Sequence, residues 1–385
     1  MHLLAAAKLG RWRPACSPRC SDWSRLLLSP VAIAGEAVMA DEAECSTSPS
    51  APPTIRRSGG WMNEWVSLLG GGVLLYFGAE WFVGGASALA LSLRVPQILV
   101  GLTVVAYGTS APEVIVGVQA ARAGHGEVAL GNVIGSNIAN IGLILGVAAL
   151  IRPARVDGGL RRRELPVLLV TTALLPFLLV DGVVSQWEAG ALLFVALGYT
   201  GWMIRAARSS AALATAVSDA KAASAAADEA GAPQPKGAAR AVATAGGGLV
   251  VLLLGGQLFI DGAVEVARAM GLSDRLVGLT IVAVGTSLPE LVTSVVAARR
   301  GHSDLAVGNV VGSNIFNVLL CLGAAGLAGS VGAPLGTLTV DLVALFVMTA
   351  LAAVFIRTER TISRLEGAVV LALYVVFTVV TVVRG

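Results

Sequence analysis

Long apolar runs alternate with short charged or glycine- and proline-rich breaks along most of the chain. Most of these runs reach about 20 residues, the length at which a helix crosses roughly 30 Å of hydrocarbon. Their periodicity is helical or featureless and lacks the two-residue alternation of a membrane β-barrel. The pattern therefore predicts an all-α integral membrane protein with ten transmembrane helices. The expected helices cover residues 64–90, 96–121, 126–151, 164–181, 186–205, 241–269, 275–298, 303–328, 336–357 and 364–383.

The composition points to the same environment. Of the 385 residues, 56% are hydrophobic and only 13% are charged, whereas a soluble domain has roughly 25% charged residues. The lipid bilayer is therefore an expected partner. The net charge of +3 does not indicate binding to nucleic acid, because the basic residues lie in the breaks between apolar runs. We expect no cofactor, and no pattern indicates an obligate protein partner.

Two segments interrupt the apolar pattern. Residues 1–61 are polar, and we predict a disordered N-terminal tail, with Met62 as an alternative start of the chain. Residues 206–240 are rich in Ala and Ser and contain Pro233 and Pro235, a composition typical of a flexible linker. The chain then divides into a first group of five helices over 62–205, a cytoplasmic linker over 206–240, and a second group of five helices over 241–385.

The basic residues predict an orientation in the membrane. Beyond residue 60, sixteen Lys and Arg residues fall on one side of the predicted membrane and four fall on the other. Because cytoplasmic loops carry the excess of Lys and Arg, we expect both termini outside the plasma (inner) membrane and the linker inside. The seven basic residues of the tail oppose this orientation, which is a further reason to consider Met62 as the start.

The chain contains an internal repeat. Residues 101–150 align with residues 278–327 without gaps, at an offset of 177, and 30 of the 50 aligned positions are identical. The shared segments include GTSAPE at 108–113 and GTSLPE at 285–290, and GNVIGSNIAN at 131–140 and GNVVGSNIFN at 308–317. Because five predicted helices separate equivalent positions, the second copy is expected to enter the membrane upside down. Inverted repeats of this kind are typical of alternating-access transporters.

Each copy carries one glutamate within an apolar run, Glu113 in the first and Glu290 in the second. An ionised residue in the membrane is costly and is a candidate functional residue. Two carboxylates that converge repel each other unless a cation lies between them. Pro112 and Pro289 interrupt the helical hydrogen bonds and free carbonyls about one turn upstream. These features together predict a cation site made by both halves.

The residues around the two glutamates are oxygen donors, which suit Ca²⁺ and Na⁺, and no His or Cys lies beside them to favour zinc or copper. Asn132, Asn137, Asn309 and Asn314 also occur in both copies, and for these we favour a role in helix packing. Glu80 has no acidic counterpart and is left out of the site. The candidate ligands besides the glutamates are Thr109, Ser110, Ser136, Asn140, Thr286, Ser287, Ser313 and Asn317.

The paired GTSxPE and GNVxGSNIxN segments resemble the α-repeats of the calcium/cation antiporter superfamily, in particular its prokaryotic sodium/calcium exchanger-like branch. The resemblance implies ten helices in two inverted five-helix repeats, and exchange of several Na⁺ for one Ca²⁺ by alternating access. It implies that the carboxylates of Glu113 and Glu290 bind Ca²⁺ and, in turn, Na⁺. It also implies that the other candidate ligands line the site and that the carbonyls of Ala106 and Ala283 serve flanking Na⁺ sites.

One departure from the resemblance leaves the coupling ion open. Asn140 and Asn317 both close their segments, whereas some sodium/calcium exchangers have Asp at one of these positions. Two carboxylates supply a charge of −2, enough for one Ca²⁺ or two Na⁺. Exchange of Ca²⁺ for H⁺ and K⁺-dependent exchange therefore stay open, and a cation channel is a further alternative. No HExxH, GxSxG or paired intramembrane Asp motif occurs, so we expect no enzyme.

Overall fold

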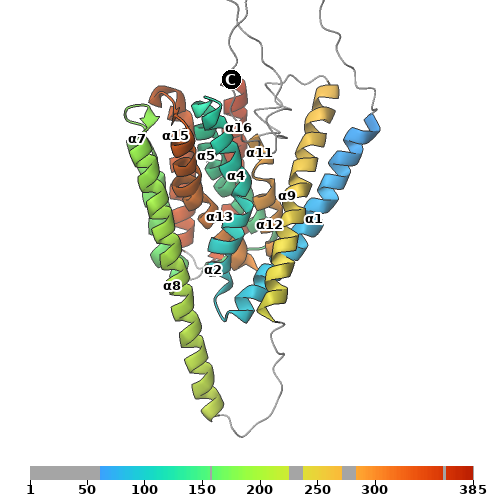
Figure 1. Ribbon diagram of the computed structural model, residues 1–385, viewed down its shortest axis with the longest axis vertical. Helices are drawn as coiled ribbons and strands as arrows, with labels where there is room; N and C mark the ends of the chain where they lie inside the picture. Colours follow the sequence, from blue (N-terminus) through green and yellow to red (C-terminus); the bar gives the residue numbers. More distant parts are fainter. Residues whose placement is uncertain (1–60, 157, 225–236, 271–282, 359–360, 385) are drawn as a thin grey trace, which may run out of the picture. The chain divides into compact units, whose positions relative to one another are not determined.

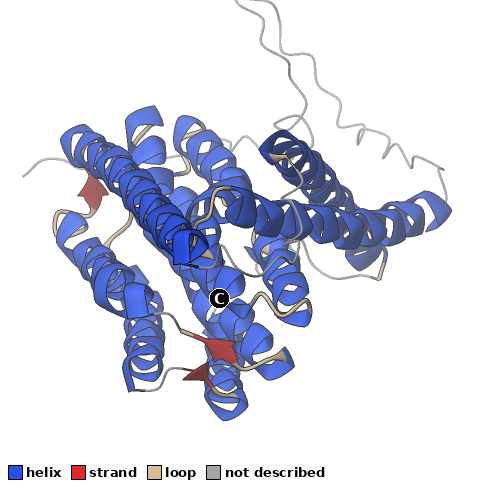
Figure 2. Ribbon diagram, turned by 90° about the horizontal axis from the view of Figure 1, so that it is seen from below, coloured by secondary structure: helices blue, strands red, loops and turns tan. Residues whose placement is uncertain are grey.

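The computed structural model describes residues 61–156, 158–224, 237–270, 283–358 and 361–384. The predicted tail over 1–61 lies outside the described residues, apart from Trp61. Helices account for nearly all of the described chain, and the strands are only two residues long (Figure 1, Figure 2). The predicted all-helical class is therefore confirmed.

The helices and strands follow the repeat. The first half contains α1 (Trp61–Ser92), α2 (Gln97–Val100), the π-helix η2 (Gly101–Val105), α3 (Ala106–Thr109), α4 (Ala111–Arg122), α5 (Gly126–Ala139), the π-helix η3 (Asn140–Leu145), α6 (Gly146–Ile151), β1 (Ala154–Arg155), the π-helix η4 (Leu160–Glu164), α7 (Leu165–Leu178), β2 (Val183–Val184) and α8 (Gln186–Ser224). The second half contains α9 (Ala238–Ala269), α11 (Ala283–Gly285), α12 (Leu288–Arg299), α13 (Ser303–Phe316), the π-helix η6 (Asn317–Cys321), α14 (Leu322–Ala328), β3 (Val331–Gly332), α15 (Leu335–Thr358), β4 (Thr361–Ile362) and α16 (Arg364–Arg384).

Seven helical segments of the described chain are long and apolar enough to cross a membrane, and a bent pair adds an eighth. That pair joins Gln97–Thr109 to Ala111–Arg122 with a bend of 42°. Two of the ten expected spans remain. The helix that includes α7 is shorter and begins with charged residues, and the span expected over 275–298 begins outside the described residues. The number ten therefore stays a prediction.

The segment predicted as a flexible linker is partly helical. α8 continues to Ser224, well past the expected end of its span at residue 205, and α9 begins at Ala238. The extension is rich in Ala, the residue with the highest helix propensity, and this explains why the helix does not stop at the end of the apolar run. Residues 225–236 lie outside the described part of the chain.

Two continuous helical segments form the centre of the molecule. Within the segment Ser303–Ala328, 83% of the most apolar window is buried inside the protein, and within Gly126–Ile151 the share is 72%. The corresponding share in α16 is 11%, as expected for a helix that faces lipid. α13 packs against α2, η2, α3 and α12, and α5 packs against α4. The two GNVxGSNIxN segments therefore lie at the buried centre, beside the two GTSxPE segments.

α1 and α9 run side by side, and both pack against α12 (Figure 1). A Cβ on Gly78 would lie 2.4 Å from the backbone nitrogen of Leu252, and a Cβ on Gly255 would lie 2.5 Å from that of Leu75. No side chain fits at these distances, so the two backbones approach closely because the residues are glycine. The seam repeats every seven residues, at Gly71, Gly78 and Gly85 on α1 and at Gly248, Gly255 and Gly262 on α9.

The four short strands extend the repeat beyond the aligned residues. β1 pairs with β4 and β2 pairs with β3, both antiparallel. α8 and α16 then begin in the same way: Ser185 N donates to Glu188 Oε2 at 2.8 Å, and Ser363 N donates to Glu366 Oε2 at 2.7 Å. Each serine hydroxyl in turn accepts from the glutamate N–H, which makes a capping box. The offset here is 178, so one inserted residue hid this part of the repeat from the ungapped alignment.

Candidate ion-binding site

Both GTSxPE segments are breaks in a helix. Ser110 and Ser287 precede α4 and α12, and each has a backbone outside the α-helical region. Pro112 and Pro289 lie in the first turn of the new helix, where a missing N–H costs no intrahelical hydrogen bond. Glu113 lies in the first turn of α4, as Glu290 does in α12, next to backbone N–H groups that have no partner within the helix. The predicted break is confirmed.

Each of the two glutamates accepts a hydrogen bond from a serine in the other half of the chain. Both side chains are 1% exposed. Ser110 Oγ lies 3.1 Å from Glu290 Oε1, and Ser287 Oγ lies 3.3 Å from Glu113 Oε1. These two contacts interchange when 177 is added to or subtracted from the residue numbers. The structure thus brings together the two carboxylates that the sequence placed 177 residues apart.

The same serines reach the central helices. Ser110 Oγ lies 3.0 Å from Ser313 Oγ on α13, and Ser287 Oγ lies 3.4 Å from Ser136 Oγ on α5. These contacts are again related by the repeat. Six of the predicted site residues therefore lie in two buried, hydrogen-bonded groups related by the repeat: Ser110 with Glu290 and Ser313, and Ser287 with Glu113 and Ser136. Because the carboxyl groups of Glu113 and Glu290 interact electrostatically, the six residues together make up one polar cluster.

Several oxygens of the site have no hydrogen-bond partner among the described residues. They are the Oε2 atoms of Glu113 and Glu290, Asn140 Oδ1 and Thr286 Oγ1. A buried polar atom without a partner costs roughly 1–3 kcal/mol, and more for a charged group. Neither glutamate has an ion pair with Lys or Arg in the described part of the chain. The cluster therefore has unpartnered oxygen acceptors, and ionisation of both carboxyl groups would add negative charge that a bound cation would neutralise.

Asparagines support the backbone of both glutamates. Asn132 Nδ2 donates to the carbonyl of Glu113 at 3.2 Å, and Asn309 Nδ2 donates to the carbonyl of Glu290 at 3.4 Å. Asn309 Nδ2 also lies 3.0 Å from Ser294 Oγ. The sequence had favoured helix packing for these asparagines, but the contacts link them directly to the site. Their presence at the same place in both copies is the signal that could have found them.

The remaining predicted residues lie beside the cluster. Thr109 Oγ1 donates to the carbonyl of Val105 at 3.1 Å and lies 3.2 Å from Asn309 Oδ1. The Ala106 carbonyl accepts the N–H of Ser110 at 3.0 Å, which leaves one lone pair for another partner. Ala283 is the first residue of α11. Asn140 and Asn317 begin η3 and η6, and both are 1% exposed.

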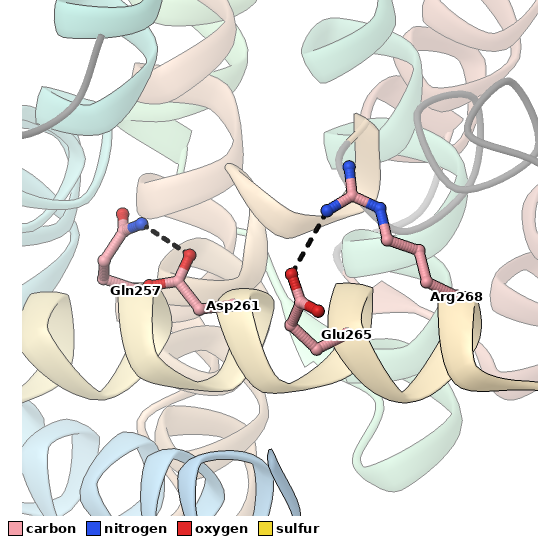
Figure 3. A network of polar contacts seen from close by, with 4 residues as sticks. All are labelled: Gln257, Asp261, Glu265 and Arg268. Carbon is pink, nitrogen blue, oxygen red and sulfur yellow. Dashed lines mark hydrogen bonds and ion pairs between the residues drawn. The ribbon is translucent and has the colours of Figure 1, made fainter. Parts of the chain in front are cut away.

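Other charged residues form contacts of their own. Glu80 on α1 pairs with Arg300 at the end of α12. On the exposed face of α9, Gln257 Nε2 donates to Asp261 Oδ1 at 3.0 Å, and Arg268 pairs with Glu265 at 3.2 Å (Figure 3). These charged residues are not repeated in the other half of the chain: Glu80 aligns with Gln257, and Asp261 aligns with a glycine. They are separate from the buried cluster.

A family profile described as sodium/calcium exchanger protein matches residues 63–205 and 240–383, which is most of the chain. The protein belongs to the sodium/calcium exchanger family. Membership confirms the resemblance drawn from the two motifs. It also confirms that the chain is a multi-pass membrane transporter and not an enzyme.

The alignments of this chain with its relatives cover nearly the whole length of each relative. The chain is 36% identical over 322 residues to the putative antiporter CaxA of Alkalimonas amylolytica, covering 80% of this chain and 96% of the relative. It is 32% identical over 338 residues to the sodium/calcium exchanger MaX1 of Methanosarcina acetivorans, covering 81% and 97%. The fold matches a structure of the sodium–calcium exchanger NCX_Mj with a TM-score of 0.70 and 32% identity, covering 82% and 98%.

Proposed function

We propose that this exchanger-family protein is a secondary active antiporter that moves Ca²⁺ and Na⁺ in opposite directions across the plasma membrane. The observation that carries the proposal is the pair of buried carboxylates, Glu113 and Glu290, each with one oxygen that has no partner among the described residues. Two such groups without a basic partner are stable together in their ionised form only when a cation neutralises them. Ca²⁺ and Na⁺ prefer hard oxygen ligands of this kind.

Coupling would follow from competition for the same oxygens. Two carboxylates supply a charge of −2, which one Ca²⁺ or two Na⁺ would neutralise. A protein that holds either set, but not both, carries one ion out for the others that it carries in. The proposed ligands are Glu113, Glu290, Thr109, Ser110, Thr286, Ser287, Ser136, Ser313, Asn140 and Asn317, with the carbonyls of Ala106 and Ala283 at flanking Na⁺ sites.

We further infer that the two halves are inverted repeats of five helices and that access alternates between the two sides of the membrane. Support comes from the hydrogen bonds of the site, which occur in pairs related by the repeat: Ser110 with Glu290, and Ser287 with Glu113. A site built by equivalent segments of two halves can open to either side through equivalent motions. The excess of Lys and Arg in the predicted cytoplasmic loops supports external termini and an internal linker.

The relatives agree with this proposal. MaX1 and NCX_Mj are described as sodium/calcium exchangers, and CaxA as a putative antiporter. Each of the three alignments covers at least 80% of this chain.

Ion flux into vesicles tests the proposal. The purified full chain is reconstituted into vesicles loaded with Na⁺ and diluted into Na⁺-free medium that contains radiolabelled Ca²⁺. We expect Ca²⁺ uptake that depends on the outward Na⁺ gradient. Uptake that is unchanged when choline replaces Na⁺ inside the vesicles would contradict Na⁺/Ca²⁺ exchange.

The same vesicles separate the second candidate, exchange of Ca²⁺ for H⁺ or with K⁺. Asn140 and Asn317 favour this alternative, because neither supplies the third negative charge that would hold more Na⁺. Uptake that follows an imposed pH gradient and ignores Na⁺ would support H⁺ coupling. A requirement for K⁺ in addition to Na⁺ would support K⁺-dependent exchange. Flux without any counter-ion, at rates far above those of a carrier, would indicate a channel.

A further inference from the structure

Four asparagines meet at the buried centre of the protein, where α5 passes into η3 and α13 passes into η6. Asn137, Asn140, Asn314 and Asn317 are each 1% exposed. Asn140 Nδ2 donates to Asn314 Oδ1 at 3.0 Å, and Asn317 Nδ2 donates to Asn137 Oδ1 at 3.0 Å. These two hydrogen bonds are related by the repeat and cross from one half of the chain to the other.

In both hydrogen bonds the donor is a proposed ligand and the acceptor is not. A carboxamide is planar, and its oxygen and its NH₂ group share one carbon atom. Once the NH₂ group is held by an acceptor, the direction of the oxygen is determined. The oxygen of Asn140 has no partner among the described residues. Asn140 follows Ser136, a member of the cluster around the glutamates, by one helical turn.

The orientation of a carboxamide decides its effect on a cation. Its oxygen attracts the ion, whereas its NH₂ group, which carries partial positive charge, repels it. A carboxamide that is free to rotate would present either group. The acceptor across the interface removes this freedom before the ion arrives, and preorganisation of this kind improves affinity because less order is lost on binding.

Packing alone does not explain Asn314, which differs in this from Asn137, whose Nδ2 donates to the backbone carbonyl of Asn314 at 3.3 Å. Asn314 Nδ2 is buried and has no partner among the described residues, which costs roughly 1–3 kcal/mol. An apolar side chain of similar shape would fill the same space without that cost. The hydrogen bond that Asn314 accepts from Asn140 is the feature that such a side chain would lose.

We propose that Asn314 and Asn137 are positioning residues of the ion site: each accepts a hydrogen bond from the NH₂ group of a ligand asparagine in the other half, so that the ligand's oxygen is presented to the cation. This inference rests on the proposed function, in which Asn140 and Asn317 are ligands. It assigns Asn314 and Asn137 to ion binding instead of helix packing.

The two positioning residues have unequal effects. Asn317 Oδ1 accepts a weak hydrogen bond from Cys321 Sγ at 3.4 Å, whereas Asn140 Oδ1 has no partner in the described part of the chain. The position equivalent to Cys321 is Ile144, which has no donor. Since the thiol already engages the oxygen of Asn317, that carboxamide is still held at its oxygen when Asn137 is removed. Replacement of Asn314 therefore weakens ion binding more than replacement of Asn137.

A double-mutant cycle tests the proposal in the full chain. Asn314→Leu, Asn140→Leu and the double variant are compared by the Ca²⁺ concentration that gives half-maximal Na⁺-dependent uptake. Each single substitution is expected to raise this concentration roughly threefold to tenfold, the equivalent of one neutral hydrogen bond. The half-maximal Ca²⁺ concentration of the double variant is expected to lie within about twofold of that of the single variant with the lower Ca²⁺ affinity, because Asn314 acts through Asn140.

Two comparisons make the cycle specific. Asn314→Leu combined with Asn317→Leu is expected to show multiplied effects, because no hydrogen bond joins these two side chains. Asn314→Asp retains an acceptor oxygen in the same shape, so Asn140→Leu is expected to show its full effect again in that background. Thr349→Val, which removes a buried hydroxyl of α15 that has no partner among the described residues, is the control and is expected to leave the half-maximal concentration unchanged.

Other results would overturn the inference. Multiplied effects in the Asn314 and Asn140 pair would show that the two residues act independently. A lower yield of folded protein or a lower maximal rate, with an unchanged half-maximal concentration, would show a structural role only. If Asn314→Leu does not fold, the cycle of Asn137→Leu with Asn317→Leu decides by the same criteria.

A second readout separates this inference from the proposed function. The rise in melting temperature caused by Ca²⁺ or Na⁺ reports ion binding to the detergent-solubilised protein without transport. If the wild type shows that rise but no Na⁺-dependent Ca²⁺ uptake, the exchange proposal fails, and the same cycles measured by the rise in melting temperature still decide the inference. If the wild type binds neither ion, both proposals fail.

Discussion

The half of the site around Glu113 and the half around Glu290 have the same residues at most positions, yet they are not equivalent. Their shared contacts are the bonds of Ser110 with Glu290 and of Ser287 with Glu113, together with the asparagine bonds to each glutamate carbonyl. These contacts occur twice because the sequence that makes them occurs twice. The two halves therefore contribute equivalent contacts to the site.

The differences lie just outside these shared contacts. Thr109 is bonded to Asn309, whereas the equivalent Thr286 hydroxyl has no partner among the described residues. Asn309 also contacts Ser294, where the first half has a glycine. Glu80 pairs with Arg300, but the equivalent Gln257 bonds to Asp261 on its own helix. The contacts at the centre of the site are therefore symmetrical, whereas the residues around them differ in charge between the two halves.

The largest effects should come from the two carboxylates. Glu113→Gln and Glu290→Gln each remove one of the two negative charges, and we expect each to reduce exchange by about a hundredfold or more, because a ligand bond to a charged group is lost and the pair no longer neutralises Ca²⁺. Radiolabelled Ca²⁺ uptake into vesicles measures this. Glu265→Gln, on the exposed face of α9, is the control and is expected to transport normally. Near-normal exchange by either site variant would show that the two halves do not share one ion.

A second comparison concerns the seam between α1 and α9. Gly78→Ala and Gly255→Ala place a Cβ 2.4 and 2.5 Å from backbone nitrogens of the facing helix, so the helices must separate. We expect each to lower the free energy of unfolding by about 1–3 kcal/mol, measured as a lower melting temperature in detergent. Gly70→Ala, where no atom lies within 4 Å of the added Cβ, is the matched control. A much smaller loss at one of the two positions would show that the seam is not symmetrical.

The threonines sharpen the comparison because the signs of their effects differ. Thr109→Val removes hydrogen bonds to Val105 and Asn309 and should destabilise the ion-free protein by about 1 kcal/mol. Thr286→Val removes a buried hydroxyl without a partner, so we expect the ion-free protein to become more stable, while Ca²⁺ affinity falls because a proposed ligand is lost. Melting temperatures with and without Ca²⁺ measure both effects. Equal losses of stability from the two variants would contradict the difference between the halves.

The smallest effect concerns the histidines of the two repeats. Burial, together with the neighbouring charges of Arg300 and Arg152, lowers the pKa of His302 below its usual value of 6.5. The folded protein therefore binds a proton at His302 less readily than the unfolded chain, so stability is lost as the pH falls below about 6.5. We expect the melting temperature of His302→Gln to fall less between pH 7.5 and pH 5 than that of the wild type. An identical pH dependence in both proteins would contradict this. His125→Gln, at the equivalent position of the other repeat, is the matched comparison.

Much of the site could be predicted from the sequence, for a physical reason. Glu113 and Glu290 are conspicuous because a carboxylate in an apolar run is costly, and Pro112 and Pro289 mark helix breaks because proline lacks an N–H. The role of Asn314 could not be predicted in this way. An asparagine in a membrane helix suits either packing or ion binding, and only the atom that it contacts decides between them.

The boundaries were harder to predict than the elements. α8 was expected to stop where its apolar run stops, but its Ala-rich extension remains helical to Ser224. The pairing of β1 with β4 and of β2 with β3 cannot be predicted from the sequence, because two-residue strands show no periodicity. The capping boxes at Ser185 and Ser363 are predictable from the sequence, because each is a Ser-x-x-Glu segment that precedes an apolar run.

The sequence by itself determined the environment of the protein, its internal repeat and the two acidic motifs, because these depend on residue type and on spacing along the chain. The tertiary structure decided which oxygens meet. It placed the serine of each half on the glutamate of the other, left one oxygen of each carboxylate without a partner among the described residues, and set Asn314 against Asn140. These contacts join residues about 175 or more positions apart, and only the packing of the helices against one another brings such residues within hydrogen-bonding distance.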